Sequence, residues 1–422
     1  MDWRPLESGL PIHFLLEVVL MGLLVLKFGG SSVRDAEHLL RMARIVREKR
    51  AAGHDVAVVL SAQGDTTDAL LEKARELSSR PSPRELDMLL SAGEQMSAAL
   101  GAMALHKLGV DAVSLCAWQL PLRTDGVHTN AEIEEVGVLR LKRELDAHRV
   151  AVVAGFQGID EMGDVTTLGR GGSDTTAVAL AVALQADLCQ IYTDVDGVYT
   201  CDPRLVPDAR KLDEITYSEM LELASLGAQV LHNRSVELAK SYSVPLEVLS
   251  SFTENPGTIV KGVVNKVEKT YITGVAQDKK IARVALTGIA DEPGMAYRVF
   301  GLLAKNKINV DMILQSYGHG ERKDIVFTLA EKDVPACTKL LEENKQSLGY
   351  ENLDVSTDVS KVSIVGAGML GNAGVAAKMF EALYQARINI RMISTSEIKI
   401  SVLIDKDESE RAVRAIHSRF FQ

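Results

Sequence analysis

The chain has 422 residues, of which 46% are hydrophobic and 25% are charged. This is an ordinary globular composition, so it excludes a wholly disordered, collagen-like or low-complexity protein. Lys and Arg number 47 and Asp and Glu number 57, which gives a formal net charge of −10. Sequence-independent nucleic-acid binding needs a basic surface, which this balance does not supply. At roughly 150 residues per domain, the length indicates two or three domains.

The cysteines indicate a reducing environment. The four cysteines are Cys116, Cys189, Cys201 and Cys337, and none forms a C-x-x-C pair. They are too sparse for a disulfide scaffold or a zinc site built from cysteines. We therefore expect a cytoplasmic protein.

The N-terminal segment has no readable function. Leu10–Leu26 is mostly apolar but is interrupted by His13 and Glu17, and it is shorter than the ~20 residues that a membrane helix needs. It also lacks the basic start and the cleavage site of a secretory signal. We expect the first domain to begin near Met21 and regard residues 1–20 as an extension.

From residue 21 to residue 265, short β-branched runs alternate with longer helical runs. The expected strands are Leu23–Lys27, Val56–Leu60, Val150–Ala154 and Leu188–Thr193. The expected helices are Val33–Arg50, Arg84–Lys107 and Thr175–Gln185. This alternation predicts an α/β fold with a mostly parallel sheet covered on both faces.

Beyond residue 265 the sequence contains an internal repeat. Gly288, Phe300 and Asn309 recur as Gly368, Phe380 and Asn389, a spacing of 80 residues. Each copy reads as a strand, a glycine-containing turn, a helix and two strands, which we place in residues 281–350 and 351–422. Such paired units often form a ligand site at their interface, although a purely structural repeat is the alternative.

Two features accompany the repeat. Residues 266–280 read as a linker, in which Tyr271–Ala276 is a candidate strand for one of the repeat sheets. Gly366–Gly371 is a literal G-x-G-x-x-G after the strand Lys361–Val365, which suggests a dinucleotide site. Because it lies in the second copy, with no acidic residue ending the next strand, we assign it to the repeat.

The first strand runs into a glycine turn, Lys27-Phe28-Gly29-Gly30-Ser31-Ser32. A strand, two glycines and a helix start form an anion site, because glycine lets a phosphate approach the backbone N–H groups. Lys27 would then reach phosphate oxygens as a point charge. A plain turn with a surface lysine is the alternative from this segment alone.

A second glycine-rich turn, Gly169–Thr176, contains an arginine and again opens a helix. The guanidinium of Arg170 suits two-point recognition of a carboxylate or phosphate. Ser173 and Asp174 have an alternative reading as helix N-caps. We favour a functional role for Arg170, because a loop rich in glycine offers it little packing.

Two further segments carry acidic candidates. Thr193–Arg204 follows a strand and resembles a calcium loop, but the twelfth position from Asp194 is Leu205 and not an acid, which excludes an EF-hand. Its place after a parallel strand favours ligand binding. Glu94 lies among small residues on a helix and is a candidate to orient an ammonium group; a solvated glutamate is the alternative.

These segments together resemble the monofunctional aspartokinases of the amino-acid-kinase superfamily. Further matching stretches are Ser61–Asp68, Leu86–Glu94, Gly155–Gly158, Thr166–Ala177 and Ile393–Ile404. The resemblance implies a three-layer αβα amino-acid-kinase domain with a mostly parallel central sheet over residues 21–265. It also implies two ferredoxin-like (βαββαβ) ACT domains over the two repeats.

The resemblance implies ATP-dependent phosphorylation of the L-aspartate side chain to 4-phospho-L-aspartate, the first step toward lysine, threonine and methionine. A carboxylate with a pKa of about 4 is already ionised at neutral pH, so the reaction needs no general base. It needs positioning and neutralisation of negative charge. Another amino-acid kinase and a catalytically inactive regulatory protein of the same fold are the alternatives.

The resemblance also assigns roles to individual residues. Lys27 is expected to stabilise the transferring phosphoryl group and Arg170 to clamp the aspartate α-carboxylate. Asp174 and Glu94 are expected to hold the α-ammonium group, and Thr67 to contact the reacting carboxylate. The implied catalytic residues are Lys27, Arg170 and Asp174, and the implied substrate-binding residues are Thr67, Glu94, Arg170, Ser173 and Asp174.

The implied nucleotide-binding residues are Lys27, Gly29, Gly30, Ser31, Thr193, Asp194, Tyr199, Arg204 and Gln229. Magnesium would arrive with ATP, so the resemblance implies no metal site of the protein's own. Two departures from the family pattern stand out. Gln229 occupies a position where a nucleotide-contacting lysine is common, and the Trp118–Pro121 loop differs from the usual Trp-Gln-Ala-Gly.

The ACT pair implies feedback inhibition by lysine, threonine or both, bound at the interface of a homodimer or higher homo-oligomer. We expect Asp291–Gly294 and Gln315-Ser316 to lie at the effector site. No nucleic-acid or membrane partner is expected.

Overall fold

The computed structural model describes residues 22–422 except 227–229, 265–270, 317–321, 370, 371 and 373. The predicted extension of residues 1–20 and Gln229 therefore lie outside the described residues. The described chain forms two compact units. The first unit ends at Gly197 and also includes Arg234–Lys261, and the second comprises Val198–Asn233 and Gly262–Gln422.

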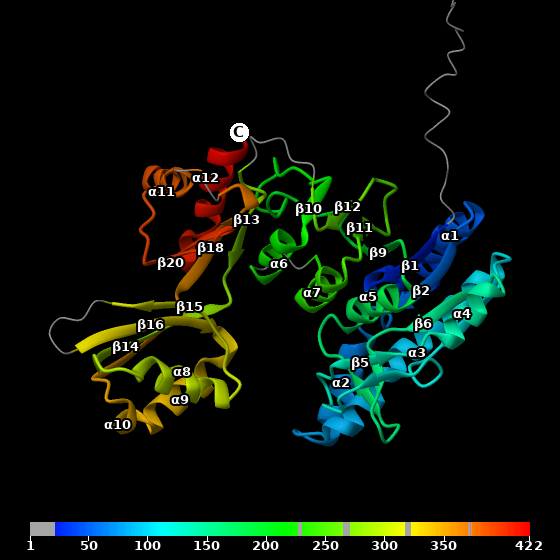
Figure 1. Ribbon diagram of the computed structural model, residues 1–422, viewed down its shortest axis with the longest axis horizontal. Coiled ribbons are helices and arrows are strands. Elements are labelled where there is room, and N and C mark those ends of the chain that lie inside the picture. The colour runs from blue at the N-terminus through cyan, green and yellow to red at the C-terminus, as the bar shows by residue number, and fades with distance from the viewer. Residues whose placement is uncertain (1–21, 227–229, 265–270, 317–321, 370–371, 373) are drawn as a thin grey trace, which may run out of the picture. The chain divides into compact units, whose positions relative to one another are not determined.

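The first unit is built on a mostly parallel sheet (Figure 1). Its strands follow the order β12 (Thr258–Lys261), β11 (Leu246–Ser250), β9 (Leu188–Thr193), β1 (Leu23–Phe28), β2 (Asp55–Leu60), β6 (Val150–Ala154) and β3 (Ala112–Leu115). All neighbours in this order pair in parallel except β11 and β12. The central strands are buried almost throughout, as continuous apolar runs covered on both faces should be. This confirms the predicted mostly parallel sheet.

Helices cover both faces of this sheet, which gives the three layers that the resemblance implied. Alternate side chains of β1, including Leu24, Leu26 and Phe28, share one core with α1 (Ala36–Ala51) and α3 (Pro83–Lys107). Helix α5 (Gly172–Leu184) also packs on β1, β2 and β9. Its side chains are buried on nearly every side, because almost all of them are small or apolar.

Two predicted helix starts differ from the observed ones by three residues, and the start of α3 differs by one. Helix α1 begins at Ala36 rather than Val33, because Gly30–Val33 forms a separate 3-10 turn and Asp35 caps α1 by accepting a bond from the His38 N–H at 3.0 Å. Helix α5 begins at Gly172 rather than Thr175, with Gly171 as its N-cap at φ 69°. Ser173 and Asp174 therefore lie within its first turn, so the alternative reading of them as N-caps is wrong.

A second, small sheet of the first unit was not predicted. It joins β5 (Ile133–Val136), β4 (Leu122–Thr124), β7 (Gln157–Ile159) and β8 (Val165–Thr167) in that order. The remaining helices of this unit are α2 (Thr66–Leu77), α4 (Leu139–Asp146) and α7 (Asn233–Tyr242).

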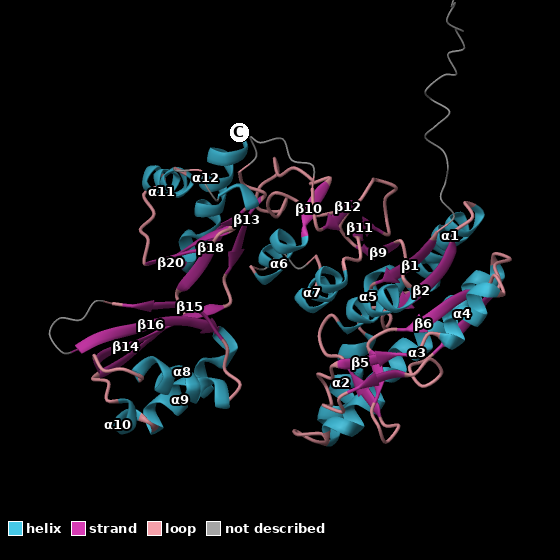
Figure 2. Ribbon diagram, viewed as in Figure 1, coloured by secondary structure: helices cyan, strands magenta, loops and turns pink. Residues whose placement is uncertain are grey.

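The second unit contains the two repeats, each a four-stranded antiparallel sheet with helices on one face (Figure 2). The first has the order β15 (Val310–Gln315), β16 (Arg322–Ala330), β14 (Ile281–Ala290) and β17 (Asn352–Ser356), with helices α8 (Met295–Lys305), α9 (Val334–Glu343) and α10 (Lys345–Leu348). Apolar residues of β14, β16, α8 and α9 form its core.

The sheet of the second repeat includes a strand from outside that repeat's own sequence. Its order is β13 (Gly274–Asp278), β18 (Val359–Val365), β20 (Lys399–Asp405) and β19 (Met392–Thr395), with helices α11 (Val375–Gln385) and α12 (Ser409–Phe421). Strand β13 occupies the place that β17 has in the first repeat. The candidate strand in residues 271–276 is thus confirmed, although it begins at Gly274. The fourth strand of this sheet therefore precedes the first repeat in the sequence.

Residues 198–233 also belong to the second unit. They include β10 (Glu214–Thr216) and α6 (Tyr217–Ser225). Glu219 of α6 is fully buried and accepts hydrogen bonds from the Thr273 hydroxyl and the Ala367 N–H. One backbone donor of the G-x-G-x-x-G turn, the Ala367 N–H, is therefore taken by a carboxylate of the protein itself.

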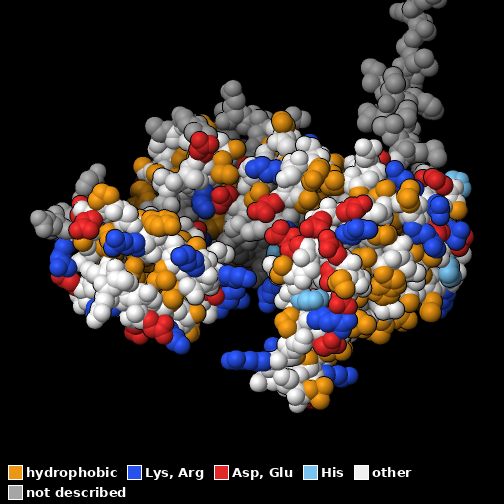
Figure 3. Space-filling model, turned by 60° about the horizontal axis from the view of Figure 1, so that its bottom comes forward, with side chains coloured by type: hydrophobic (Ala, Val, Ile, Leu, Met, Phe, Trp, Pro, Cys, Tyr) orange, Lys and Arg blue, Asp and Glu red, His pale blue; other side chains and the backbone are white. Residues whose placement is uncertain are grey.

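The surface carries mixed charge. On the face drawn in Figure 3, Lys and Arg side chains lie in small groups among acidic and apolar ones. Among the described residues, no helix combines the length and the apolar character needed to cross a bilayer.

Candidate active site

The candidate site lies at the carboxyl ends of the central strands of the first unit. Lys27 of β1 pairs in register with Val59 of β2 and with Ile191 of β9, and Leu60 pairs with Ala154 of β6. The turns that follow these strands therefore meet at one edge of the sheet. Open α/β sheets bind their ligands at this edge.

A buried ion pair marks the centre of this edge. The Lys27 Nζ atom lies 2.6 Å from Oδ1 of Asp174, in the first turn of α5. The two side chains are only 11% and 13% exposed. Lys27 is thus a buried cation held by a carboxylate on the neighbouring layer, and the alternative of a surface lysine is wrong.

The glycine turn after β1 approaches the next loop closely. Gly30 accepts a bond from the Gly64 N–H at 3.1 Å. A Cβ atom on Gly30 would lie 2.7 Å from the Ala62 carbonyl oxygen, so the position requires glycine. The Gly29 N–H donates to the Tyr192 carbonyl oxygen at 3.3 Å. Gly30 and Ser31 begin a helical turn, where N–H groups have no intrahelical acceptor. The turn can therefore present donors to an anion.

Glu94 of α3 is a buried carboxylate with one oxygen unused by the described residues. The side chain is 4% exposed, its Oε1 accepts the Ala62 N–H at 3.0 Å, and its Oε2 has no hydrogen-bond partner among the residues described. Burial raises the pKa of Glu94 to about 7, although the bond from Ala62 opposes this rise. The alternative of a solvated glutamate is wrong.

Glu94 also fixes the loop between β2 and α2. Gly93 permits the close approach, since a Cβ there would lie 2.8 Å from the Ala62 Cβ atom. Thr67, in the first turn of α2, is half-buried beside this loop. The loop therefore connects Glu94 with Thr67 at the same edge of the sheet.

Arg170 extends from the turn before α5. Gly169 and Gly171 on either side have φ of 75° and 69°, left-handed values that glycine adopts readily. The Arg170 side chain is exposed, and it makes no hydrogen bond or ion pair within the described part of the chain. It is thus a cation available to a ligand.

Ser173, Thr193 and Asp194 lie near the same edge. Ser173 is 8% exposed and packs against Gly155, where a Cβ would lie 2.8 Å from the Ser173 Cβ atom. Thr193 ends β9, and its hydroxyl donates to the exposed Asp194 carboxylate at 3.1 Å.

Comparison with known proteins identifies the family. Residues 22–250 match the amino acid kinase family, and residues 284–344 and 362–420 match the ACT domain. Aspartate kinase from Stutzerimonas stutzeri is 49% identical over 401 residues, or 95% of this chain and 97% of the relative. Aspartokinase from Mycolicibacterium smegmatis is 50% identical over 405 residues, or 95% and 96% of the two chains.

The chain belongs to the aspartokinase family. It is therefore an aspartate kinase with regulatory ACT domains. The crystal structure of E. coli aspartokinase III in complex with aspartate and ADP has the same fold, with a TM-score of 0.80 and 29% identity. The likeness covers 95% of this chain and all of that one.

Three predicted nucleotide-site residues of this aspartokinase are not among the described residues of the first unit. Tyr199 and Arg204 belong to the second unit. The exposed Arg204 pairs with Asp202 at 2.7 Å and lowers the pKa of that carboxyl. Gln229 lies outside the described residues.

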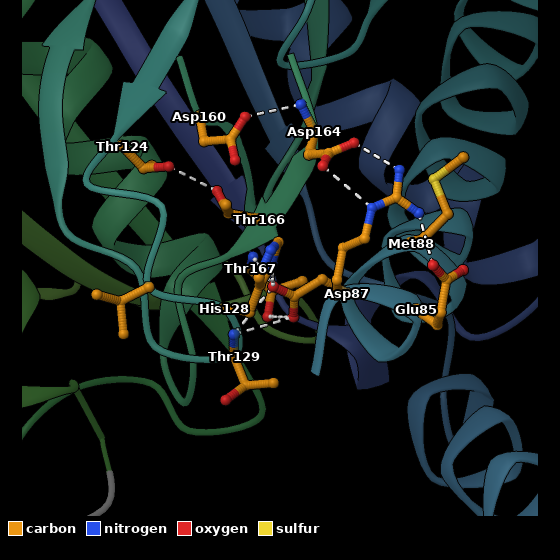
Figure 4. A network of polar contacts seen from close by, with 12 residues as sticks. Glu85, Asp87, Met88, Thr124, His128, Thr129, Asp160, Asp164, Thr166 and Thr167 are labelled. Carbon is orange, nitrogen blue, oxygen red and sulfur yellow. Dashed lines mark hydrogen bonds and ion pairs between the residues drawn. The ribbon is translucent and has the colours of Figure 1, made fainter. Parts of the chain in front are cut away.

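Sequence reasoning missed two residues that shape the aspartokinase site. Arg234 of α7 donates to the Leu168 and Ala131 carbonyl oxygens at 3.0 and 2.8 Å. Asp87 of α3 is fully buried in the polar network of Figure 4. A signal for Asp87 was present, because it lies seven residues before Glu94 and so shares its helix face.

Proposed function

We propose that this aspartokinase transfers the γ-phosphoryl group of ATP to the side-chain carboxylate of L-aspartate. The product would be 4-phospho-L-aspartate, the entry to lysine, threonine and methionine by way of diaminopimelate. The observation that carries the proposal is the buried Lys27–Asp174 pair beside the Gly29-Gly30 turn. It sets a cation next to backbone donors at the edge of the sheet where a phosphate would lie.

The reaction needs no proton transfer from the protein. An oxygen of the aspartate β-carboxylate attacks the γ-phosphorus, and an O–P bond forms. The bond from that phosphorus to the β,γ-bridging oxygen breaks, and ADP leaves with the electron pair. Because both the nucleophile and the leaving group are anionic, rate acceleration comes from positioning and charge neutralisation.

In this proposal Lys27 faces the transferring phosphoryl group, and the turn of Gly29, Gly30 and Ser31 lies against the phosphates, with the Gly30 and Ser31 N–H groups as donors. Asp174 orients the Lys27 ammonium through the 2.6 Å contact. Magnesium would enter with ATP rather than at a site of the protein's own. It would add to the neutralisation of the charge that spreads over the phosphate oxygens.

Aspartate would be held by groups of opposite charge. Arg170 is proposed to clamp the α-carboxylate, since its guanidinium is exposed and unpaired within the described chain. Glu94 is proposed to bind the α-ammonium through its unpartnered Oε2, together with Asp174. Thr67 would contact the reacting carboxylate and Ser173 would line the pocket. That E. coli aspartokinase III binds aspartate and ADP supports this pair of ligands.

The remaining proposed nucleotide contacts follow from the resemblance in sequence. They are Thr193, Asp194, Tyr199, Arg204 and Gln229. We also propose the domain limits expected from the sequence, with the catalytic domain in residues 21–265, a linker in 266–280 and the ACT domains in 281–350 and 351–422. The family matches at residues 22–250, 284–344 and 362–420 fall within these limits.

We propose feedback inhibition by lysine, threonine or both at the ACT domains of a homodimer or higher homo-oligomer. E. coli aspartokinase III forms a complex with lysine and aspartate in its T-state. In this chain Asp291 pairs with Lys323 at 2.8 Å, and Gly294 caps α8 at φ 94°. A cytoplasmic location is proposed because all four cysteines are free and buried.

The test is turnover of ATP with L-aspartate, with the acyl phosphate trapped as its hydroxamate. Lysine and threonine are added singly and together. Hydroxamate formation that depends on aspartate, and that an end product suppresses, is expected. A folded enzyme that makes no hydroxamate but still binds an amino acid would overturn the proposal in favour of a regulatory protein.

A further inference from the structure

A buried carboxylate lies behind the loop that carries Arg170. Asp87 of α3 is fully buried, and both of its oxygen atoms accept hydrogen bonds. The donors are the Thr129 N–H, the N–H and hydroxyl of Thr167, and Nδ1 of His128, at distances from 2.5 to 3.1 Å. Figure 4 shows these groups converging on Asp87 from two separate segments, residues 128–129 and Thr167.

One of these bonds holds a strained residue. Thr129 has φ 68°, a left-handed conformation that β-branched residues rarely adopt. Its N–H points at both oxygens of Asp87, at 3.1 and 2.9 Å. Such strain persists only where surrounding contacts impose it, and it concentrates at functional sites. Asp87 supplies the contact that imposes it here.

The strained segment packs directly on the residue before Arg170. A Cβ atom on Gly169 would lie 2.8 Å from the Asn130 Oδ1 atom and 3.1 Å from the Thr129 carbonyl oxygen. The position of Thr129 therefore limits where the Gly169 backbone can lie. This is a first connection from Asp87 to the Arg170 loop.

The second connection runs along the chain. Thr167 ends β8, and Arg170 follows three residues later. The Thr167 carbonyl accepts the Ala131 N–H at 2.9 Å, and its own N–H and hydroxyl are held by Asp87. Beyond Arg170, the Gly172 N–H closes the turn onto the Gly169 carbonyl at 3.0 Å. The backbone of Arg170 is thus fixed on both sides.

The side chain of Arg170 has no such support. It is exposed and has no partner within the residues that the structure describes. Its aim at a ligand therefore depends on its backbone, and a shift of about 1 Å in a substrate-positioning group can cost ~100-fold in rate. The loop that sets this aim is anchored by Asp87 and Thr167.

We propose that Asp87 is a positioning residue for aspartate: its carboxylate fixes the Thr129 and Thr167 backbones and thereby sets the place of Arg170. The inference rests on the proposed role of Arg170 in binding the α-carboxylate. A carboxylate is suited to this place because it only accepts hydrogen bonds, whereas an amide would turn a donor toward N–H groups. Since Asp87 acts through Arg170, its loss should raise the KM for aspartate and should not change the KM for ATP.

The test uses steady-state kinetics of the full chain with four single variants. Thr167→Val removes one donor to Asp87 without changing the shape of the side chain, and Thr167→Ser keeps that donor. Asp87→Asn replaces the carboxylate itself. Asp164→Asn is the matched control, because Asp164 precedes the other end of β8 and forms an exposed pair with Arg84.

We expect Thr167→Val to raise the KM for aspartate about tenfold, as loss of one charge-assisted bond predicts, and to leave the KM for ATP within twofold. Asp87→Asn should have a larger effect of the same kind. Thr167→Ser and Asp164→Asn should behave as the parent enzyme. Equal rises in both KM values, or an unchanged aspartate KM in folded Thr167→Val, would overturn the inference.

A double-variant cycle separates this inference from the proposal on which it rests. Arg170→Ala alone should raise the KM for aspartate strongly. If it does not, the clamp role of Arg170 fails and the inference fails with it. In the Arg170→Ala background, Thr167→Val should have no further effect on aspartate KM, because its route of action is gone. Additive effects would show that Thr167 and Asp87 act independently of Arg170, and only the inference would fall.

Discussion

Lys27 and Asp174 form the ion pair that joins the first strand of the sheet to the first turn of α5, with 2.6 Å between Nζ and Oδ1. The pair lies beneath the glycine turn that follows β1. It connects two motifs that are far apart in the sequence. Because both side chains are largely shielded from water, the attraction between their charges is weakly screened. In the proposed function the lysine faces phosphate while the aspartate fixes its direction.

Lys27→Met should abolish turnover and also lower stability. Removal of one partner leaves the other charge buried and unpaired, at a cost of roughly 3 kcal/mol or more. The double variant Lys27→Met with Asp174→Asn should regain much of that stability while remaining inactive. Urea unfolding and the hydroxamate assay measure the two effects separately. Full activity in folded Lys27→Met would contradict the role given to Lys27.

The pKa of Glu94 predicts a pH dependence of aspartate binding. Burial raises this pKa to about 7, so the carboxylate of the free enzyme is mostly protonated at pH 6 and mostly ionised at pH 8. Since the substrate ammonium would bind the ionised form, the KM for aspartate should fall roughly tenfold between these pH values. In Glu94→Gln it should be high and flat. If the KM for aspartate of Glu94→Gln fell with pH as it does in the parent, Glu94 would not be the group responsible.

The same pKa predicts a stability effect with a definite sign. The ordinary value of 4.5 rises to about 7 on folding, so Glu94 favours the fold most below pH 4.5, and this contribution is lost as pH rises to about 7. The loss is on the order of 3 kcal/mol. The stability of Glu94→Gln relative to the parent should therefore be higher at pH 8 than at pH 5. Thermal melts of both proteins at the two pH values check this. A difference in melting temperature between variant and parent that is the same at pH 5 and pH 8 would contradict it.

Gly30→Ala should disable the phosphate turn. The added Cβ would lie 2.7 Å from the Ala62 carbonyl oxygen, so the turn must move. We expect the KM for ATP to rise tenfold or more, because the backbone donors move with the turn. Gly301→Ala is the control, since the nearest atom to its Cβ is the flexible Tyr297 ring at 3.8 Å. If both variants kept the parent KM for ATP, the turn would not be the phosphate site.

The sequence predicted those strands and helices whose signal lies within a short stretch of the chain. Continuous apolar runs predicted strands such as Val150–Ala154 and Leu188–Thr193 with their observed bounds. The start of α5 was misplaced because its N-cap is a glycine in left-handed conformation, and a glycine-rich turn does not show which residue that is. The three-residue strands β7 and β8 are too short to give a periodic pattern.

Most contacts between distant segments could not be predicted, although a strand near residues 271–276 was expected to join one of the repeat sheets. The pairing of β13 with β18 places a strand from before the first repeat in the sheet of the second, and no spacing in the sequence encodes it. The site was anticipated as a set of motifs by resemblance. The burial of Glu94 and the donors around Asp87 come from tertiary packing, so they appeared only in the structure.

Glu219 should be critical for the stability of the second unit. Its carboxylate forms a capping box with Thr216 and also accepts bonds from Thr273 beside β13 and from the Ala367 N–H after β18. Glu219→Gln turns an amide donor toward these donors in a fully buried place. We expect a loss of roughly 3 kcal/mol and faster hydrogen exchange at Ala367.

Glu222→Gln on the same helix is the matched control. Glu222 pairs with Lys399 at 2.8 Å, and both side chains are partly exposed, so its loss should cost less than about 1 kcal/mol. Thermal unfolding and exchange measured by mass spectrometry distinguish the two variants. Equal destabilisation by both would mean that α6 is held by its surface pair as much as by its buried carboxylate. The larger effect of Glu219→Gln is expected because a buried acceptor cannot be replaced by water.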